Sequence, residues 1–537
     1  MKRYIKTMFL VGLSSLTLVP TSCIDEVEPT DVASEEAIGR SALATEGLLM
    51  GMPMYLNAAD DDYHFQFGYG CMIHMRDVMT GDQTVTYSGY DWFSPWASAS
   101  GMGKTYARPS YVYNYYYKLA QTANGLIAAV DTTTATDPAK GNWACASAFR
   151  AMTYLDIARM YEFLPNDKIA SVNADGNDVA GLTAPIVTEK TTQEEARNNP
   201  RATHQEMFDF ILNDLDNAEK YIELMENSSK TLPHLDAVYG LKARLYLWNG
   251  DYEEAEKYAH LAIAATKTKP MTRAQSLSTT AGFNDISLWM WGSQMTSEDD
   301  AVKTGIINWT SWMSNETTFG YASAGPFVSI DRALYDRISD TDWRKLLWKA
   351  PEGHPLFGQN PWLVDEGTAA SFPDYASLKF RPNEGNMEDY KTGAASAFPL
   401  MRVEEMYFIE AEAAAHQDAA RGAELLNAFM KANRDAAYSC PATSTEGVVD
   451  EVILQKRIEL WGEGHTFFDI KRLNISVTRA YKGTNVTDDN QLMNTNGRPA
   501  WMNFVISQSE EDNNNGVIGY NNPDPTGAYT PIARETL

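Results

Sequence analysis

The chain has 537 residues, of which 44% are hydrophobic and 11% aromatic, and it carries a formal net charge of −27. So acidic a chain lacks the basic surface that binding to nucleic acid or to anionic lipid requires, although its charge says little about a neutral ligand. The four cysteines form no CxxC pair, which argues against a disulfide scaffold and against a zinc knuckle.

The first 23 residues have the organisation of an export signal. Three basic residues precede an apolar run from Met8 to Val19, which has the length of a signal-peptide core and is too short for a stable transmembrane helix. Small residues then lead to Cys23, an order that resembles a lipobox. We predict a lipoprotein signal peptide over residues 1–22, lipidation of Cys23 and an acidic tether over residues 23–33. The alternative is a soluble secreted protein in which this cysteine is incidental.

Apolar residues at helical spacing dominate much of the remaining chain. The spacing predicts single long helices within Tyr111–Asp131, Asn142–Pro165 and His204–Met225. Two further segments predict helix pairs, His234–Ala265 with a break at "NGDY" and Met401–Asp435 with a turn at "HQD". Small and large apolar residues alternate in the first pair, as in a tetratricopeptide repeat, and stacked pairs of this kind form a superhelical scaffold.

Four long spacers separate the helical segments and are rich in Gly, Pro, Asn, Ser and aromatic residues: 60–108, 267–327, 350–398 and 476–537. Loops of this length are usually functional or disordered, and their aromatic content argues against disorder. No clean linker divides the chain. We therefore predict a mostly α fold, with a tetratricopeptide-like scaffold that carries long, ordered insertions, and one binding domain over residues 34–537.

No known catalytic motif is present: the sequence has no GxSxG elbow, P-loop, HExxH or GxGxxG after a strand. The acidic stretch "AADDDYH" could hold calcium, but a solvated turn is the simpler interpretation, because it lacks the glycine and glutamate of an EF-hand loop. Glu459, Glu463 and Asp469 suggest a glycosidase, which needs two carboxylates across a sugar bond. Lysines and arginines in the same stretch favour structural ion pairs instead. We expect no catalytic residue, cofactor or metal.

Six segments, in chain order, resemble the SusD/RagB-like family of outer-membrane lipoproteins. They are "YNYYYKLAQTANGLI", "ACASAFRAMTYLDIARMYEFLP", "LKARLYLWNGDYEEAEKYA", "GPFVSIDRALYDRISDTDWR", "LMRVEEMYFIEAEAAA" and "QKRIELWGEGHTFFDIKR". The last segment is the most specific. This chain departs from the family pattern at Glu162, where glycine is common, and at Gln455, Lys456 and Thr466.

The resemblance implies a surface lipoprotein of the outer membrane, anchored by lipid and facing the exterior, that binds a ligand and is not an enzyme. It implies capture of a glycan, or of a peptide in some branches of the family, and delivery to a SusC-like TonB-dependent transporter. Two other functions remain as alternatives: a periplasmic tetratricopeptide-type adaptor that binds proteins, and a surface glycosidase.

Ligand contacts in the family tend to fall in two aromatic stretches, residues 87–103 and 307–325. An aromatic ring offers a flat apolar face to a sugar, so we predict ligand stacking on the tryptophans and tyrosines of these stretches, with nearby polar contacts. The predicted residues are Tyr90, Trp92, Trp96, Trp309, Trp312, Tyr321, Arg76 and Asp77. The alternative for each ring is that it anchors its loop to the scaffold.

Overall fold

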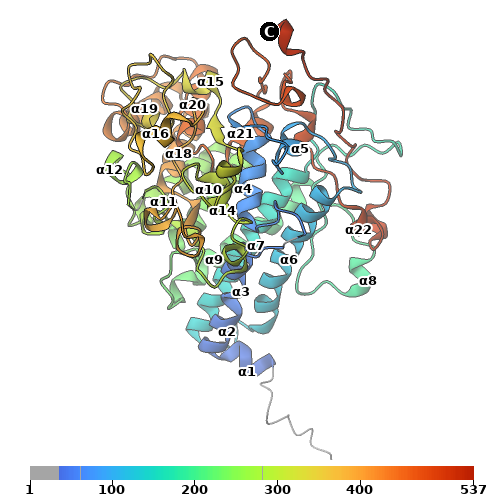
Figure 1. The fold of residues 1–537 in the computed structure, drawn as a ribbon. Helices are drawn as coiled ribbons and strands as arrows, with labels where there is room; N and C mark the ends of the chain where they lie inside the picture. Colours follow the sequence, from blue (N-terminus) through green and yellow to red (C-terminus); the bar gives the residue numbers. More distant parts are fainter. Residues whose placement is uncertain (1–34, 61, 281) are drawn as a thin grey trace, which may run out of the picture.

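The computed structural model describes residues 35–60, 62–280 and 282–537 (Figure 1). The predicted signal peptide, Cys23 and the acidic tether lie outside the described residues. The eight longest helices are α6 (Ala107–Ala129), α7 (Asp137–Tyr161), α9 (His204–Tyr221), α10 (Leu235–Asn249), α11 (Tyr252–Ala265), α18 (Val403–Gln417), α19 (Ala419–Asn433) and α20 (Thr445–Glu459). Seven of them cover helices that we predicted, apart from shifts at the ends, and α20 is the one that the predicted segments do not include.

Shorter helices fill the N-terminus and the spacers. They are α1 (Glu35–Arg40), α2 (Ala42–Leu49), α3 (Gly51–Leu56), α4 (Tyr69–Val78), α5 (Ser94–Ala97), α8 (Gln193–Ala196), α12 (Arg273–Ser276), α13 (Asp300–Lys303), α14 (Trp309–Met313), α15 (Arg332–Tyr335), α16 (Glu366–Ala370), α17 (Tyr390–Gly393), α21 (Thr466–Leu473) and α22 (Gln508–Glu511). In the part of the chain that the structure describes, no helix combines the length and the apolarity needed to cross a bilayer.

The first predicted helix pair is formed by α10 and α11. Gly250 lies between them in a left-handed conformation with φ of 75°, which glycine adopts at little cost at the end of a helix. Asp251 then caps α11 by accepting a hydrogen bond from the backbone N–H of Glu254. Ala243 and Ala255 are fully buried between neighbouring helices. The small-residue pattern therefore does mark a close helix contact.

The second predicted pair is α18 and α19, joined at Asp418, whose side chain accepts hydrogen bonds from the first turn of α19. A Cβ atom added at Gly422 would overlap the side chain of Ala415 on α18. Glycine is therefore required here for the two helices to approach this closely. Figure 1 shows the pairs gathered on one side of α6 and α7, with α1 at one end of the molecule and the C-terminus at the other.

Two small antiparallel sheets join the spacers to one another. Strand β1 (Gln83–Val85) pairs with β3 (Val328–Ile330), with Thr84 opposite Ser329. Strand β2 (Trp291–Gln294) pairs with β4 (Ala397–Met401), with a register irregularity after Trp291. These pairs connect the first spacer to the segment that follows the second spacer, and the second spacer to the end of the third.

Helix α4 is a part of the fold that the sequence did not reveal. All ten of its residues are buried, so it shows no polar face and no helical periodicity of polar and apolar residues. It contains Cys71, which is free and buried, as is Cys145, whereas Cys440 is free and partly exposed.

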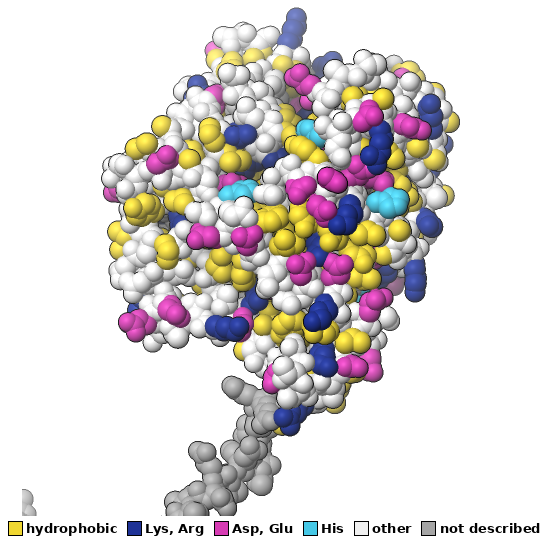
Figure 2. Space-filling view, turned by 180° about the vertical axis from the view of Figure 1, so that it is seen from behind, with side chains coloured by type: hydrophobic (Ala, Val, Ile, Leu, Met, Phe, Trp, Pro, Cys, Tyr) yellow, Lys and Arg dark blue, Asp and Glu magenta, His cyan; other side chains and the backbone are white. Residues whose placement is uncertain are grey.

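The rear face of the molecule shows how the charge is distributed there (Figure 2). Acidic and basic side chains are intermixed on this face, and hydrophobic side chains lie between them. No basic surface extends over this side.

A buried ion-pair network connects the C-terminal helices to the spacers. Glu463 pairs with Lys379 at 2.6 Å and with Arg402 at 2.8 Å. Glu459, four residues earlier, pairs with Arg434 at 2.7 Å and with Arg344 at 3.1 Å. Burial alone would raise the pKa of Glu459, but the surrounding arginines hold that pKa well below its ordinary value. The prediction of structural ion pairs in this stretch is confirmed.

The positions at which the chain departs from the family pattern also have structural partners. Glu162 accepts hydrogen bonds from the Nδ1 atom of His204 at 2.8 Å and from the indole N–H of Trp248 at 2.9 Å. Lys456 pairs with Asp469 at 2.9 Å. Glu162 and Lys456 are therefore held by polar contacts in the interior.

We predict that Glu463→Gln lowers the free energy of unfolding by about 3–5 kcal/mol, because Lys379 and Arg402 would stay buried without a full counter-charge. Chemical denaturation of the purified protein measures this. Glu424→Gln on the exposed face of α19 is the matched control and should change stability by less than about 0.5 kcal/mol. Equal stabilities of the two variants would contradict a central role for the network.

Candidate ligand-binding site

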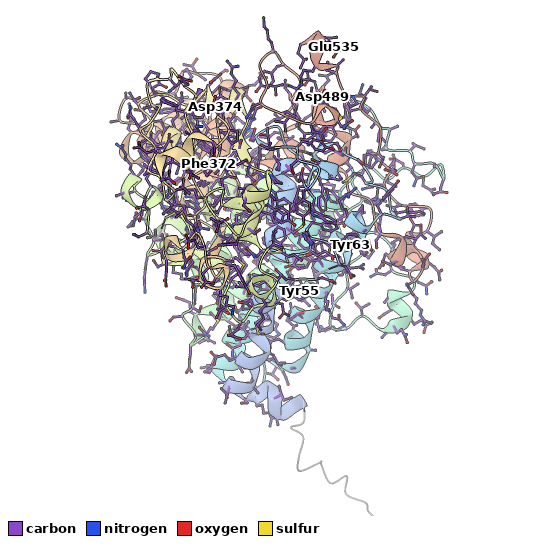
Figure 3. All side chains as sticks on the ribbon, viewed as in Figure 1. Tyr55, Tyr63, Phe372, Asp374, Asp489 and Glu535 are labelled. Atoms are coloured by element: carbon purple, nitrogen blue, oxygen red, sulfur yellow. The ribbon has the colours of Figure 1, made fainter. Side chains whose placement is uncertain are left out.

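Four aromatic side chains meet at the surface, where two loops of the first spacer, residues 60–108, come together. They are Tyr63, His64, Tyr90 and Trp92, and we call them the aromatic platform. The Tyr63 side chain is 39% exposed and that of Tyr90 is 51% exposed, whereas His64 and Trp92 are half-buried. Figure 3 labels Tyr63, which lies on the same side of the molecule as Tyr55.

The rings of the platform pack edge to face and in stacks. The His64 ring stacks on Trp92 with centroids 5.1 Å apart, and Tyr63 meets Trp92 edge-on at 6.2 Å. Tyr90 meets His64 edge-on at 6.5 Å. Aromatic pairs prefer these geometries, so each ring holds its neighbour in place. The exposed edges and faces of these rings are therefore fixed before a ligand binds.

A second, buried layer of rings supports the platform from below. The Trp312 and Tyr321 rings stack with centroids 3.6 Å apart, and the Trp312 indole N–H donates to the backbone carbonyl of His64 at 3.3 Å. The Tyr321 hydroxyl is hydrogen-bonded to His64 Nδ1. Phe65 packs against Trp96 at 4.9 Å. The two aromatic stretches predicted from the sequence are therefore in contact.

The loop between Tyr90 and Trp92 is held by Asp91. Its carboxylate accepts hydrogen bonds from the backbone N–H groups of Phe93 at 2.7 Å and Ser94 at 2.9 Å, where the chain enters α5. The backbone N–H of Tyr87 donates to the hydroxyl of Thr487 at 2.7 Å. The loop is thus attached at both ends, which lowers the entropy lost when a ligand orders it.

The predicted ligand-contact residues divide into two groups. Tyr90 is exposed and Trp92 is half-buried at the platform, and their contact with a ligand remains a prediction. The other four rings have no exposed face and pack inside the core, so we correct their assignment to structural support: Trp96, Trp309, Trp312 and Tyr321. Trp309, for example, packs between Phe380 and Phe398.

Arg76 and Asp77 are also interior residues, because both lie on the buried helix α4. Arg76 pairs with Asp156 at 2.9 Å and donates to the Tyr116 hydroxyl at 3.2 Å. Asp77 accepts a hydrogen bond from the backbone N–H of Gly464 at 2.9 Å. In this structure neither side chain can supply the polar contact beside the rings that we predicted.

Tyr63 and His64 are platform residues that we did not predict from the sequence. Both belong to the stretch that we considered as a calcium loop and interpreted as an acidic turn. Along "HFQF" the side chains of Phe65 and Phe67 are buried and those of His64 and Gln66 are half-buried, an alternation that could have suggested a solvent-facing side with His64 on it. Tyr63 is exposed and does not follow this alternation. Within residues 35–60, 62–280 and 282–537, no group of three or more His, Cys, Asp or Glu side chains could hold a metal ion.

The three carboxylates that suggested a glycosidase are buried and ion-paired. Glu459 and Glu463 belong to the network described above, and Asp469 pairs with Lys456 and Arg472. A glycosidase needs its carboxylates on either side of a sugar bond. These three face cations inside the core, so they do not form such a site.

Comparisons with known proteins identify two family models in the chain. The model described as the SusD family matches residues 364–536, and the model described as "Starch-binding associating with outer membrane" matches residues 64–247. A search of curated proteins gives no match.

Solved structures with the same fold cover most of the chain. A SusD-like carbohydrate binding protein from Bacteroides vulgatus is 23% identical, with a TM-score of 0.70 over 89% of this chain and 97% of that one. A SusD superfamily protein from Bacteroides thetaiotaomicron is 18% identical, with a TM-score of 0.67 over 89% and 98%. A further one from Bacteroides fragilis is 17% identical, with a TM-score of 0.62 over 89% and 99%. At these identities the likeness establishes the fold.

Burial raises the pKa of Asp77 to about 8, so its carboxyl group is protonated in the folded protein at neutral pH. Between its unfolded pKa near 4 and about 8, the folded state binds the extra proton, and stability therefore falls as pH rises. We predict that Asp77→Asn, which keeps an acceptor for Gly464, removes this part of the pH dependence. Melting temperatures measured from pH 5 to pH 9 test this prediction. The melting temperature of the variant should rise relative to that of the wild type toward pH 9. Parallel curves would contradict the prediction.

Proposed function

Because the chain belongs to the SusD/RagB-like family, we propose that it is a binding protein of the outer membrane that captures a glycan at the aromatic platform. The observation that carries this proposal is the platform itself, with Tyr63, Tyr90 and Trp92 open to solvent over a buried layer of rings. The apolar C–H face of a sugar ring packs on such surfaces, and fixed rings lose little entropy on binding. Glycan binding also agrees with the names of the matched model and of the Bacteroides vulgatus structure.

We further propose that the chain passes its ligand to a SusC-like TonB-dependent transporter. Lipidation of Cys23 would anchor the protein, and residues 23–34 would join the lipid to α1 at one end of the molecule. Fully extended, a segment of this length spans at most about 40 Å, so the body would stay close to the membrane. In this proposal the protein faces the exterior and performs no catalysis.

The platform is tested by Trp92→Ala, measured by calorimetry with the glycan that a glycan array identifies. Covering ~40–80 Å² of ring contributes about 1–2 kcal/mol, so affinity should fall about five- to thirtyfold. Phe357→Ala is the control, because Phe357 is also exposed, at 50%, and is not part of the platform. Unchanged affinity in both Trp92→Ala and Tyr90→Ala would place the ligand elsewhere. Trp96→Ala should instead lower stability, because Trp96 is buried.

The partner is tested by gentle solubilisation of outer membranes from cells that make both proteins. We expect the protein to co-purify with a large TonB-dependent barrel and to label with palmitate. Cys23→Ser should abolish the labelling and release the protein from the membrane fraction. Isolation of the wild-type protein alone, or membrane association of Cys23→Ser with label, would contradict this part of the proposal.

A further inference from the structure

A second concave site lies apart from the platform, next to α22. It is a pocket of about 360 Å³, which we call the polar pocket, and its walls come from residues 103–105, 173–175 and 505–524. None of the four platform residues lines it. Its volume falls near the lower end of the range of about 300–1,000 Å³ typical of small-molecule sites, which suits one or two sugar rings.

The walls of the polar pocket are fixed by hydrogen bonds between segments that are far apart in the sequence. The amide of Asn173 donates to the backbone carbonyls of Gly519 at 2.9 Å and Asn521 at 3.0 Å. The amide of Asn521 donates to Glu511 at 2.7 Å, and the backbone N–H of Gln508 donates to the carbonyl of Lys104 at 3.0 Å. The pocket is therefore already formed before a ligand binds.

The hydrogen-bonding groups that remain available in the polar pocket are mainly acceptors. Among its described lining residues, the ammonium group of Lys104 is paired with Glu511, whereas Asp175 and Asp524 have no cationic partner. One oxygen of Asp524 accepts from the backbone N–H of Thr526 at 2.8 Å, and the other lies beside Gly103. Carboxylates accept hydrogen bonds from hydroxyl groups, and two of them can hold two hydroxyls of one ring.

The charge of the polar pocket limits which ligand it accepts. Three carboxylates against one ammonium group leave two negative charges uncompensated. These negative charges would repel a uronate or another acidic sugar, whereas they would not repel an uncharged sugar. We propose that the polar pocket is a second saccharide site, which binds one uncharged sugar ring through Asp175 and Asp524.

Gly103 provides a test that removes no hydrogen-bonding group. A Cβ atom at this position would overlap the free oxygen of Asp524, so Gly103→Ala must displace that carboxylate. Asp524→Asn tests the charge itself, because it keeps the shape and the acceptor for Thr526. Asp512→Asn, an equal change of charge at an exposed position of the same segment, is the matched control.

Saturation-transfer NMR with D-glucose, D-galactose, D-mannose, N-acetyl-D-glucosamine and D-glucuronate measures binding to the full mature chain. All variants are compared in the Trp92→Ala background, where binding at the platform is weakened, and at least one neutral sugar should bind that protein equally well with and without Asp512→Asn. Loss of a charge-assisted hydrogen bond should weaken that sugar about tenfold in Asp524→Asn and in Gly103→Ala. D-glucuronate should bind at least about tenfold more weakly than that sugar.

Three results would overturn the proposal: no neutral sugar binds the Trp92→Ala protein, D-glucuronate binds it most tightly, or both pocket variants bind as the Trp92→Ala protein does. Melting temperatures of the variants show that each is folded. Loss of all sugar binding on Trp92→Ala alone would support the platform and overturn the polar pocket, whereas loss that requires Asp524→Asn or Gly103→Ala would support the polar pocket. Failure of the platform and failure of the polar pocket are therefore distinguishable.

Discussion

The buried ion-pair network at Glu459 and Glu463 is the constraint on which the arrangement of the spacers depends. A buried carboxylate is costly unless it is paired, so each glutamate must find cations inside the core. Those cations come from distant parts of the chain: Lys379 from the third spacer, Arg402 from the start of α18 and Arg434 from the end of α19. Satisfying the two glutamates therefore fixes the spacer, the helix pair and the C-terminal helices together.

This constraint extends from the core to the binding surface. Gly464 follows Glu463 directly and donates its backbone N–H to Asp77 on α4. His74, on the same helix, packs against Phe93 at 4.2 Å and against Trp312 at 5.8 Å. Phe93 and Trp312 belong to the ring layer that carries the platform. The rigidity that a preformed ligand surface needs is thus supplied by interior contacts.

Sequence patterns predicted the scaffold well and the site only in part. Helix pairs such as α10 and α11 bury one stripe of residues, so their periodicity is visible without a structure. Helix α4 is buried on every side and therefore has no such pattern. Composition marked the two aromatic stretches, but it could not tell a buried supporting ring such as Trp312 from a half-buried ring at the surface such as Trp92, because both are tryptophans and tryptophan suits either position.

The sequence by itself determined the acidic character, the export-like start, the helix pairs and the family, since each follows from local composition, spacing or motif order. Only the tertiary structure decided which rings face solvent, how Tyr63 and His64 join Tyr90 and Trp92, and where three remote segments enclose the polar pocket. The physical reason is that burial and pocket formation depend on contacts between residues hundreds of positions apart. Thr105 and Asp524 line one pocket, yet nothing in either neighbourhood of the chain indicates the other.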